Sequence, residues 1–354
     1  MRPAGTFDVD YARDMAIVRT RLQWIMLAVF FAGLIALPHF SGVYWLHIVS
    51  TTGFVLIAVL GLHITTGLCG QINLGQSAFM AVGAYTAAIL TAKLGLPFLV
   101  ALPCAGVMAG MVGMIFGAPA LRIKEFYLAM ATLAAQFIII WFIVHIDAII
   151  GMELTGGAYG LDVPFASIGA LVFDTPVKMY YLIMAITLIM GLFALNITRT
   201  RVGRAFVAVR DNDLAAEVMG VNLFYYKILA FFIGCSFAGV AGSLQAHYLN
   251  FIGFEQFRLH ESVWYLGMIV IGGMGSPLGA VMGTVFVRGL DVASDNIAPI
   301  LSATFPFLPM NLVMPVRMIV FAVVIMMFLI YEPRGLAHRW RIFKASYRLW
   351  PYAY

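Results

Sequence analysis

The side chains best placed to do chemistry lie in one uncharged stretch near the N-terminus. Residues 61–79 read GLHITTGLCGQINLGQSAF, contain four glycines, and carry the polar side chains Thr66, Gln71, Asn73, Gln76 and Ser77 between two apolar segments. The glycines make the stretch a poor continuous helix. Backbone that leaves helical geometry at membrane depth is tolerated only inside protein or beside a wet cavity. We therefore predict a translocation path here; the alternative is an ordinary polar loop between two spans.

Patterns for catalysis or metal binding are not found in the sequence. None of the sixteen Asp and Glu residues falls deep within an apolar segment, whereas a proton- or sodium-coupled carrier usually needs an intramembrane carboxylate or broken helices that supply ion-binding carbonyls. No GxxxxGK[ST] loop occurs, so the chain is not itself a P-loop ATPase. The histidines lack ligand spacing, and Cys69, Cys104 and Cys235 lie far apart as packing residues. We expect no catalytic residue, no metal site and no cofactor bound by this chain.

A basic loop, residues 199–227, separates two long apolar segments and carries five of the twenty-one basic residues. The bias of Lys and Arg towards cytoplasmic loops predicts that it lies inside the cell. The pattern predicts a helix over 202–210 and a second, six-residue helix that Asp211-Asn212-Asp213 caps and Gly220 ends. Six residues rise about 9 Å, too little for a stable isolated helix. Something must hold this helix, unless the loop is merely topogenic.

Length and composition place the chain among polytopic membrane proteins. It has 354 residues, of which 63% are hydrophobic and 10% charged. A bilayer core of about 30 Å needs about 20 residues per helical span, which predicts an all-α fold with about eight to ten transmembrane helices. We predict a cytoplasmic tail at 1–23, one transmembrane domain at 24–335, and a second cytoplasmic tail at 336–354. The basic pI comes from loop charges, and no nucleic-acid motif accompanies them.

The topology follows from the spans and from the basic residues. The predicted spans are 24–40, 43–62, 77–91, 96–118, 126–146, 179–197, 224–248, 262–290 and 312–331. Gly272 to Pro277 interrupts the eighth, which predicts a re-entrant hairpin or two separate helices. Either solution brings both termini to the cytoplasm and leaves sixteen of the twenty-one basic residues inside.

Three strings resemble known permeases. Gly70-Gln71-Ile72-Asn73-Leu74-Gly75-Gln76, followed by Gly83-Ala84-Tyr85, resembles a motif of the LivM and LivH permeases, and it adds Tyr85 to the expected path. Ala215-Ala216-Glu217, with Gly220, Asn222 and Lys227, resembles the coupling loop of ABC importer permeases of the LivM type. Thr155-Gly156-Gly157 is similar to the same family more loosely, because Ala158-Tyr159 departs from its pattern.

The resemblance implies roles for particular residues. In the family the loop seats its short helix in a groove of a separate ATPase subunit, here with Leu214 and Val218 as the docking face. The implied coupling residues are Arg201, Gly203, Arg204, Asp211, Asp213, Leu214, Ala215, Ala216, Glu217, Val218 and Gly220. Thr155, Gly156 and Gly157 lie in a loop of low basic content, which fits the outer side, where the family meets a periplasmic solute-binding protein.

The resemblance also implies an assembly in the bacterial inner membrane. Its expected partners are a LivH-like second permease, two ATP-binding cassette subunits that bind the ATP, a periplasmic binding protein and the lipid bilayer. Branched-chain amino acids are the expected substrates, although related permeases import urea, short amides and other small polar solutes. The alternative function is a passive channel or secondary carrier, in which loop 199–227 is only a linker.

Overall fold

The computed structural model describes residues 21–118, 125–169, 171–304, 313–332 and 334–349. Most of the predicted N-terminal tail, the basic residues Arg122 and Lys124, and the end of the C-terminal tail lie outside the described residues.

The described residues confirm the all-α fold. Helices account for nearly all the regular structure, and the strands form only two short antiparallel pairs, β1 with β4 and β2 with β3. The strands are β1 Leu161–Asp162, β2 Ser167–Ile168, β3 Leu171–Val172 and β4 Phe251–Ile252. The helices are α2 Arg21–Phe40, α3 Val43–Leu62, η1 His63–Leu68, α4 Gln76–Ala88, η2 Ile89–Lys93, α5 Phe98–Gly117, α6 Glu125–Ile150, α7 Pro176–Ile197, α8 Arg201–Asp211, α9 Asp213–Val218, α10 Leu223–Leu249, η4 Phe254–Phe257, α11 Leu259–Gly272, α12 Pro277–Thr304, α13 Val313–Tyr331 and α14 Leu336–Leu349.

Among the described residues, fewer helices are long and apolar enough to span a bilayer than the eight to ten predicted. By length and composition, five described helices could cross a bilayer, or up to seven if each of two bent helix pairs counts as one span. Part of the difference is α4, predicted as the third span over 77–91. It has 13 residues, about 20 Å at 1.5 Å per residue, and eleven of them are buried within the protein. Its apolar character therefore reflects burial by other helices rather than contact with lipid.

The predicted break at Gly272 to Pro277 is confirmed, and the bent helix pair fits either a broken span or a re-entrant hairpin. α11 ends at Gly272 and α12 begins at Pro277. The chain bends by 117° between the two helices. Gly273 adopts φ +104, a conformation that strongly favours glycine, so the sequence signal for the break lies where the chain turns.

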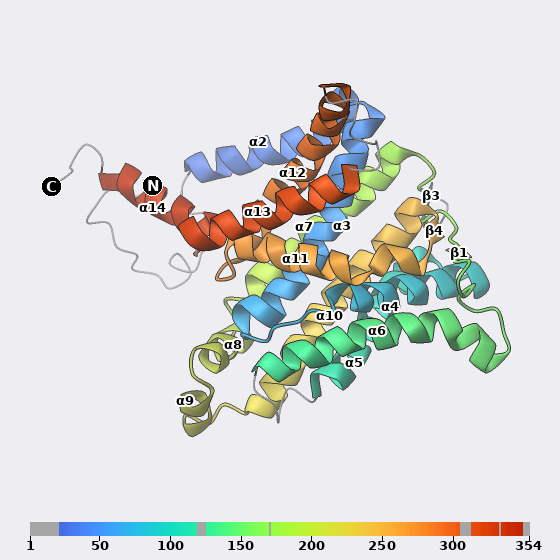
Figure 1. The fold of residues 1–354 in the computed structure, drawn as a ribbon, viewed down its shortest axis with the longest axis horizontal. Coiled ribbons are helices and arrows are strands. Elements are labelled where there is room, and N and C mark those ends of the chain that lie inside the picture. The colour runs from blue at the N-terminus through green and yellow to red at the C-terminus, as the bar shows by residue number, and fades with distance from the viewer. Residues whose placement is uncertain (1–20, 119–124, 170, 305–312, 333, 350–354) are drawn as a thin grey trace.

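α10 is the central helix, and it packs against α3, α4 and α5. Its small-residue run 238–242 allows this close approach. A Cβ added at Gly239 would lie 2.5 Å from the carbonyl oxygen of Ala105 in α5, and one at Gly242 would lie 2.0 Å from that of Met80 in α4. Figure 1 shows α4, α5 and α10 side by side in the middle of the bundle. Small residues thus serve helix packing, as they commonly do in membranes.

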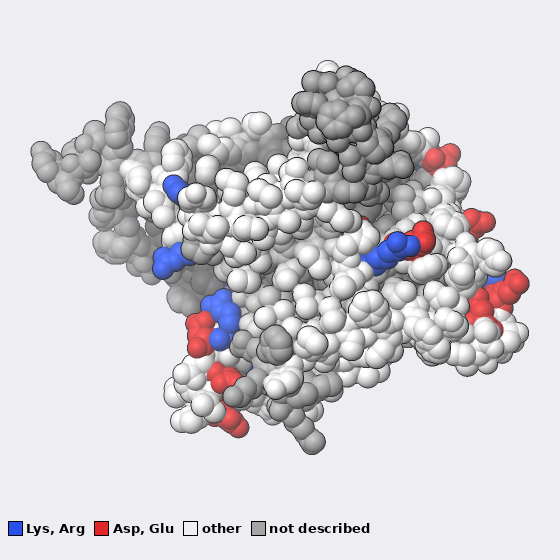
Figure 2. All heavy atoms as spheres, viewed as in Figure 1, with Lys and Arg blue, Asp and Glu red and all other residues white. Residues whose placement is uncertain are grey.

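Charged side chains gather at two ends of the visible surface, while most of the surface between them is uncharged (Figure 2). One end carries α8, α9 and α14, and the opposite end carries β1 and β4 (Figure 1). Large apolar side chains such as Phe137, Trp141 and Ile189 are exposed between the two ends. This distribution is that of a multi-pass membrane protein with an apolar belt.

Candidate functional site

The polar stretch breaks the helix over a shorter length than predicted. α3 continues through Leu62 and passes into the π-helix η1, so only residues 69–75 lie outside regular structure before α4 begins. Gly70 has φ +75 within this break. The glycines at 61 and 67 therefore do not end the helix. A Cβ at Gly61 would lie 2.4 Å from the carbonyl oxygen of Gly234, so this glycine serves close packing against α10.

Most of the predicted path residues bind other parts of the chain. The Asn73 side-chain amide donates to Gln76 Oε1 at 2.9 Å, and Gln76 Nε2 donates to the carbonyl oxygen of Ala58 at 2.9 Å. Ser77 Oγ donates to the carbonyl oxygen of Phe257 at 2.9 Å, and Thr66 Oγ1 to that of Gln71 at 3.1 Å. All of these side chains are buried. Their hydrogen bonds hold the break between α3 and the η4–α11 junction.

Gln71 and Tyr85 differ from the other predicted path residues. Both amide atoms of Gln71 and the hydroxyl oxygen of Tyr85 are buried and have no hydrogen-bond partner in the described part of the chain. Buried polar atoms are normally paired, so unpaired ones require an explanation. These two side chains have hydrogen-bonding capacity that the described fold does not use.

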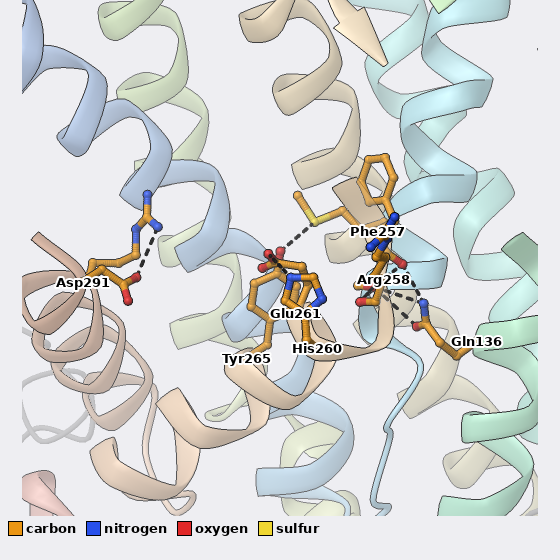
Figure 3. Close-up of polar contacts among 10 residues, drawn as sticks. Gln136, Phe257, Arg258, His260, Glu261, Tyr265 and Asp291 are labelled. Atoms are coloured by element: carbon orange, nitrogen blue, oxygen red, sulfur yellow. Dashed lines mark hydrogen bonds and ion pairs between the residues drawn. The ribbon is translucent and has the colours of Figure 1, made fainter. Parts of the chain in front are cut away.

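Gln136 in α6 is a buried residue that the sequence analysis missed. Its Nε2 donates to the carbonyl oxygen of Phe257 at 2.7 Å, and its Oε1 accepts from Ala78 N and from Ser262 Oγ, both at 3.1 Å. Figure 3 shows Gln136 reaching from its helix to the backbone at Phe257 and Arg258. The signal in the sequence is a lone Gln in the apolar span 126–146, but its partners are far away along the chain.

The basic loop forms the two predicted short helices, α8 and α9. Thr200 Oγ1 accepts from Gly203 N at the start of α8, and Asn212 Oδ1 accepts from Ala215 N at the start of α9. Phe206 and Val209 are buried, so α8 packs on the bundle with its apolar side. Gly220 has φ +86 just after α9. Both caps and the terminating glycine follow the sequence pattern.

α9 presents apolar side chains to the outside of the bundle. Leu214 is 71% exposed and Val218 87% exposed. Of the other expected coupling residues, Gly203 and Ala216 are buried, whereas those exposed are Arg201, Arg204, Asp211, Asp213, Ala215, Glu217 and Gly220. Figure 1 shows α9 at the periphery of the molecule, beyond the ends of the long helices.

Arg210, at the end of α8, joins the basic loop to the broken helix. Its NH1 donates to the carbonyl oxygen of Gly67 at 2.9 Å, while Asp211 Oδ1 accepts from its Nε at 3.0 Å and its NH2 at 2.8 Å. Its Cγ packs over Gly70, where an added Cβ would lie 2.8 Å away. Gly67 in turn packs against the carbonyl oxygen of Met274, in the turn between α11 and α12. The end of α8, the helix η1 and the α11–α12 turn, which are distant in sequence, therefore meet around Gly67.

Thr155 shapes the loop at the opposite end of the molecule. It is buried, its Oγ1 donates to the carbonyl oxygen of Ile143, and its N–H donates to Asp147 Oδ1, both at 2.9 Å. Gly156 and Gly157 follow with φ of +73 and +55. The loop exposes Tyr159, which is 93% exposed. Tyr159 is therefore the surface residue of this motif, and Thr155 is internal.

One expectation about the acidic residues is wrong. Asp291 lies within α12 and is 5% exposed, so an acid does lie within an apolar span. Arg288 NH1 lies 3.4 Å from Asp291 Oδ2. The sequence reading placed Arg288 near the end of the eighth span, whereas α12 continues to Thr304. In the described residues, no group of three or more His, Cys, Asp or Glu side chains is arranged to hold a metal ion.

Comparison with known proteins agrees with the helical architecture. Residues 44–329 match the family model "Branched-chain amino acid transport system / permease component". The high-affinity branched-chain amino acid transport system permease protein LivM of Escherichia coli (strain K12) is 32% identical over 264 residues, 68% of this chain and 61% of the relative. A probable branched-chain amino acid transport permease protein LivM of Methanocaldococcus jannaschii is 26% identical over 245 residues, 67% of each chain.

Weaker similarity reaches a further kind of importer. The autoinducer 2 import system permease protein LsrC of Enterobacter sp. (strain 638) is 32% identical over 114 residues, 30% of this chain and 33% of the relative. No solved structure matches the chain significantly. Because the family model covers most of the chain and the helices form a multi-pass bundle, the chain belongs to the family of branched-chain amino acid transport permease components.

Proposed function

We propose that this chain is one permease subunit of an ATP-driven importer of branched-chain amino acids in the bacterial inner membrane. Its partners in this proposal are a second, LivH-like permease, two ATP-binding cassette subunits and a periplasmic binding protein. ATP binds to the cassette subunits rather than to this chain. The named function of the LivM relatives supports the substrate, and the exposed apolar face of α9 supports the ATPase partners.

The α9 face is the observation that carries the proposal. Leu214 and Val218 lie on the six-residue helix α9, and Met219, which is 84% exposed, follows it, so three large apolar side chains are exposed together. An apolar cluster outside the membrane belt is costly in water and typical of a docking surface. Asp213 and Glu217 lie on the same short helix and are exposed, so a groove with an apolar floor and a polar rim would fit it.

Arg210 gives this docking surface a route into the membrane domain. A shift of α8 moves the donor to the Gly67 carbonyl, and Gly67 contacts the α11–α12 turn at Met274. Binding energy spent at α9 can therefore bias two arrangements of the broken segments. In the proposal, Gln71 and Tyr85 face the solute in one of these arrangements, with Thr66 beside them, while Asn73, Gln76 and Ser77 hold the break.

The outer end of the molecule meets the binding protein in this proposal. Thr155, Gly156 and Gly157 fix the loop from within, and Tyr159 supplies the contact. In this proposal both termini lie in the cytoplasm, because sixteen of the twenty-one basic residues fall in or next to the two tails, at Arg122 and Lys124, and in loop 199–227.

A capture experiment tests the coupling surface. Tagged chain is co-expressed with the second permease and the ATPase subunit, and the retained ATPase is measured after purification in detergent. Leu214→Asp, which puts a charge into the apolar face, is expected to abolish retention. Leu171→Asp is the matched control, because Leu171 is 66% exposed at the opposite end of the molecule. Equal retention by Leu214→Asp and the unaltered chain would contradict docking at α9.

A further inference from the structure

A charged cluster lies within the spanning helices. Arg288 is eleven residues beyond Pro277, the start of α12, which is about 16 Å along the helix, and it lies within the bent helix pair that could span the membrane. Its NH2 donates to Thr51 Oγ1 of α3 at 2.6 Å, and its NH1 lies 3.4 Å from Asp291 Oδ2. The Arg288 side chain is 24% exposed and that of Asp291 7%. Ionised groups within membrane-spanning segments are rare and mark functional sites by default.

The geometry of this pair is poor for a structural ion pair. A stabilising Arg–carboxylate pair is short and bidentate, with contacts of about 2.7–2.9 Å, whereas Arg288 touches Asp291 through one long contact. The Arg288 Nε is buried without a hydrogen-bond partner among the described residues. A buried pair repays its desolvation only when its geometry is excellent. Stability alone therefore does not explain why Arg288 lies here.

Arg288 and Asp291 line a cavity of about 120 Å³ between α3, α11, α12 and α13. Glu261 and His260 of α11 line it as well, with His260 Nε2 3.2 Å from Glu261 Oε1. Figure 3 shows both of them on α11, with Asp291 on the neighbouring helix. One water needs roughly 10–15 Å³ of such volume, so the cavity has room for a solute of several heavy atoms.

The remaining lining of the cavity is mostly apolar. Val55 of α3, Trp264 and Met268 of α11 and Met318 of α13 supply it, together with Tyr265 of α11, whose hydroxyl donates to Met80 Sδ. A guanidinium, two carboxylates and an apolar wall are thus combined in one small space.

We propose that this cavity binds the zwitterionic head group of a small α-amino acid. Arg288 binds the carboxylate through its planar set of donors, Glu261 and Asp291 bind the ammonium group, and the apolar wall contacts the aliphatic side chain. This deepens the proposed function and rests on it, because it assigns a solute site in the permease itself.

The test measures binding to the purified permease–ATPase complex without the binding protein. L-leucine is compared with leucinamide, which lacks the carboxylate, and with 4-methylpentanoate, which lacks the ammonium group. The readout is the ligand-induced rise in unfolding temperature over a concentration series. Leucine is expected to stabilise the unaltered complex more than either analogue. Arg288→Gln is expected to weaken the apparent leucine affinity about tenfold or more.

Arg258→Gln is the matched control. It removes an arginine charge near the start of α11, where Arg258 pairs with the exposed Glu255 at 2.6 Å and does not line the cavity. If Arg288→Gln fails to assemble, Glu261→Gln keeps the shape of the side chain and is expected to weaken leucine binding more than 4-methylpentanoate binding. Equal binding of all three ligands by the unaltered complex, or unchanged leucine affinity in Arg288→Gln or in Glu261→Gln, overturns the assignment.

Uptake in proteoliposomes separates this inference from the proposed function. If the unaltered complex with its binding protein takes up no leucine, the proposed function fails, whereas leucine binding that Arg288→Gln abolishes still supports the cavity. If uptake is normal and Arg288→Gln leaves both binding and uptake within twofold of the unaltered complex, the cavity assignment fails and the proposed function stands.

Discussion

Replacing Gln136 by Leu tests whether the hydrogen bonds around the broken helix stabilise the fold. The substitution removes the hydrogen bonds to Phe257 O, Ala78 N and Ser262 Oγ. Side-chain hydrogen bonds between membrane helices are worth about 0.6 kcal/mol each, so three give about 2 kcal/mol. Ala78 N also donates to Gly75 O, and Phe257 O also accepts from Ser77 Oγ. No backbone group is left unpaired, so the larger cost of an orphaned buried group does not apply.

The assay is unfolding of the purified chain in mixed detergent micelles, followed by tryptophan fluorescence. Gln136→Leu is expected to lower the free energy of unfolding by about 2 kcal/mol, a factor of roughly 30 in the equilibrium. Gln245→Leu is the matched control, because its buried Oε1 has no hydrogen-bond partner in the described part of the chain. Its stability should be unchanged or slightly higher. Equal losses of stability in the two variants would refute this role of the Gln136 hydrogen bonds, because removal of a buried Gln side chain would then explain both losses.

Three further outcomes follow from the contacts. Arg210→Ala should raise the ATP hydrolysed per leucine imported in proteoliposomes, while Arg258→Ala, whose side chain pairs with Glu255 outside the basic loop, should not. Equal ratios in the two variants would contradict the proposed coupling through Arg210. Gly239→Val should lower the free energy of unfolding by about 3 kcal/mol, because the larger side chain overpacks against Ala105. The monodisperse peak in size-exclusion chromatography should be lost in this variant, whereas Gly191→Val, with no atom within 4 Å of its added Cβ, should keep it. Tyr159→Ala should reduce stimulation of ATP hydrolysis by the binding protein without changing the unfolding temperature, and a drop in that temperature would contradict a surface role.

The helices were predictable where local rules decide them. The bounds of α5, α7, α10 and the α11–α12 break follow from apolar length and from glycine and proline. α9 was predictable to the residue because its start and end depend on the adjacent Asn212 and Gly220. Such signals act over a few residues, so a single sequence contains them in full.

Burial by other helices was not predictable in the same way. α4 and a lipid-facing span have similar composition, because protein and lipid interiors are both apolar. The partners of Gln76, Ser77 and Gln136 lie up to 185 residues away, and only the fold brings them together. Asp291 was misplaced for a related reason: α12 continues beyond its apolar run to Thr304, and the contact of Arg288 with Thr51 of α3 depends on the fold.

The contacts around Arg210 connect the break after η1 with the turn between α11 and α12. Gly67 lies between Arg210 on one side and the Met274 carbonyl on the other, and Gly273, next to Met274, contacts the backbone of Gly335 ahead of α14. Added Cβ atoms would meet backbone at Gly67, Gly273 and Gly335 alike, so these segments pack backbone to backbone. Contacts of this kind leave little room for independent movement. A displacement of α8 therefore moves η1 and the α11–α12 turn together, and α12 carries Arg288 at the cavity. Such a displacement would reach both Gln71, next to Gly70, and the charged cavity.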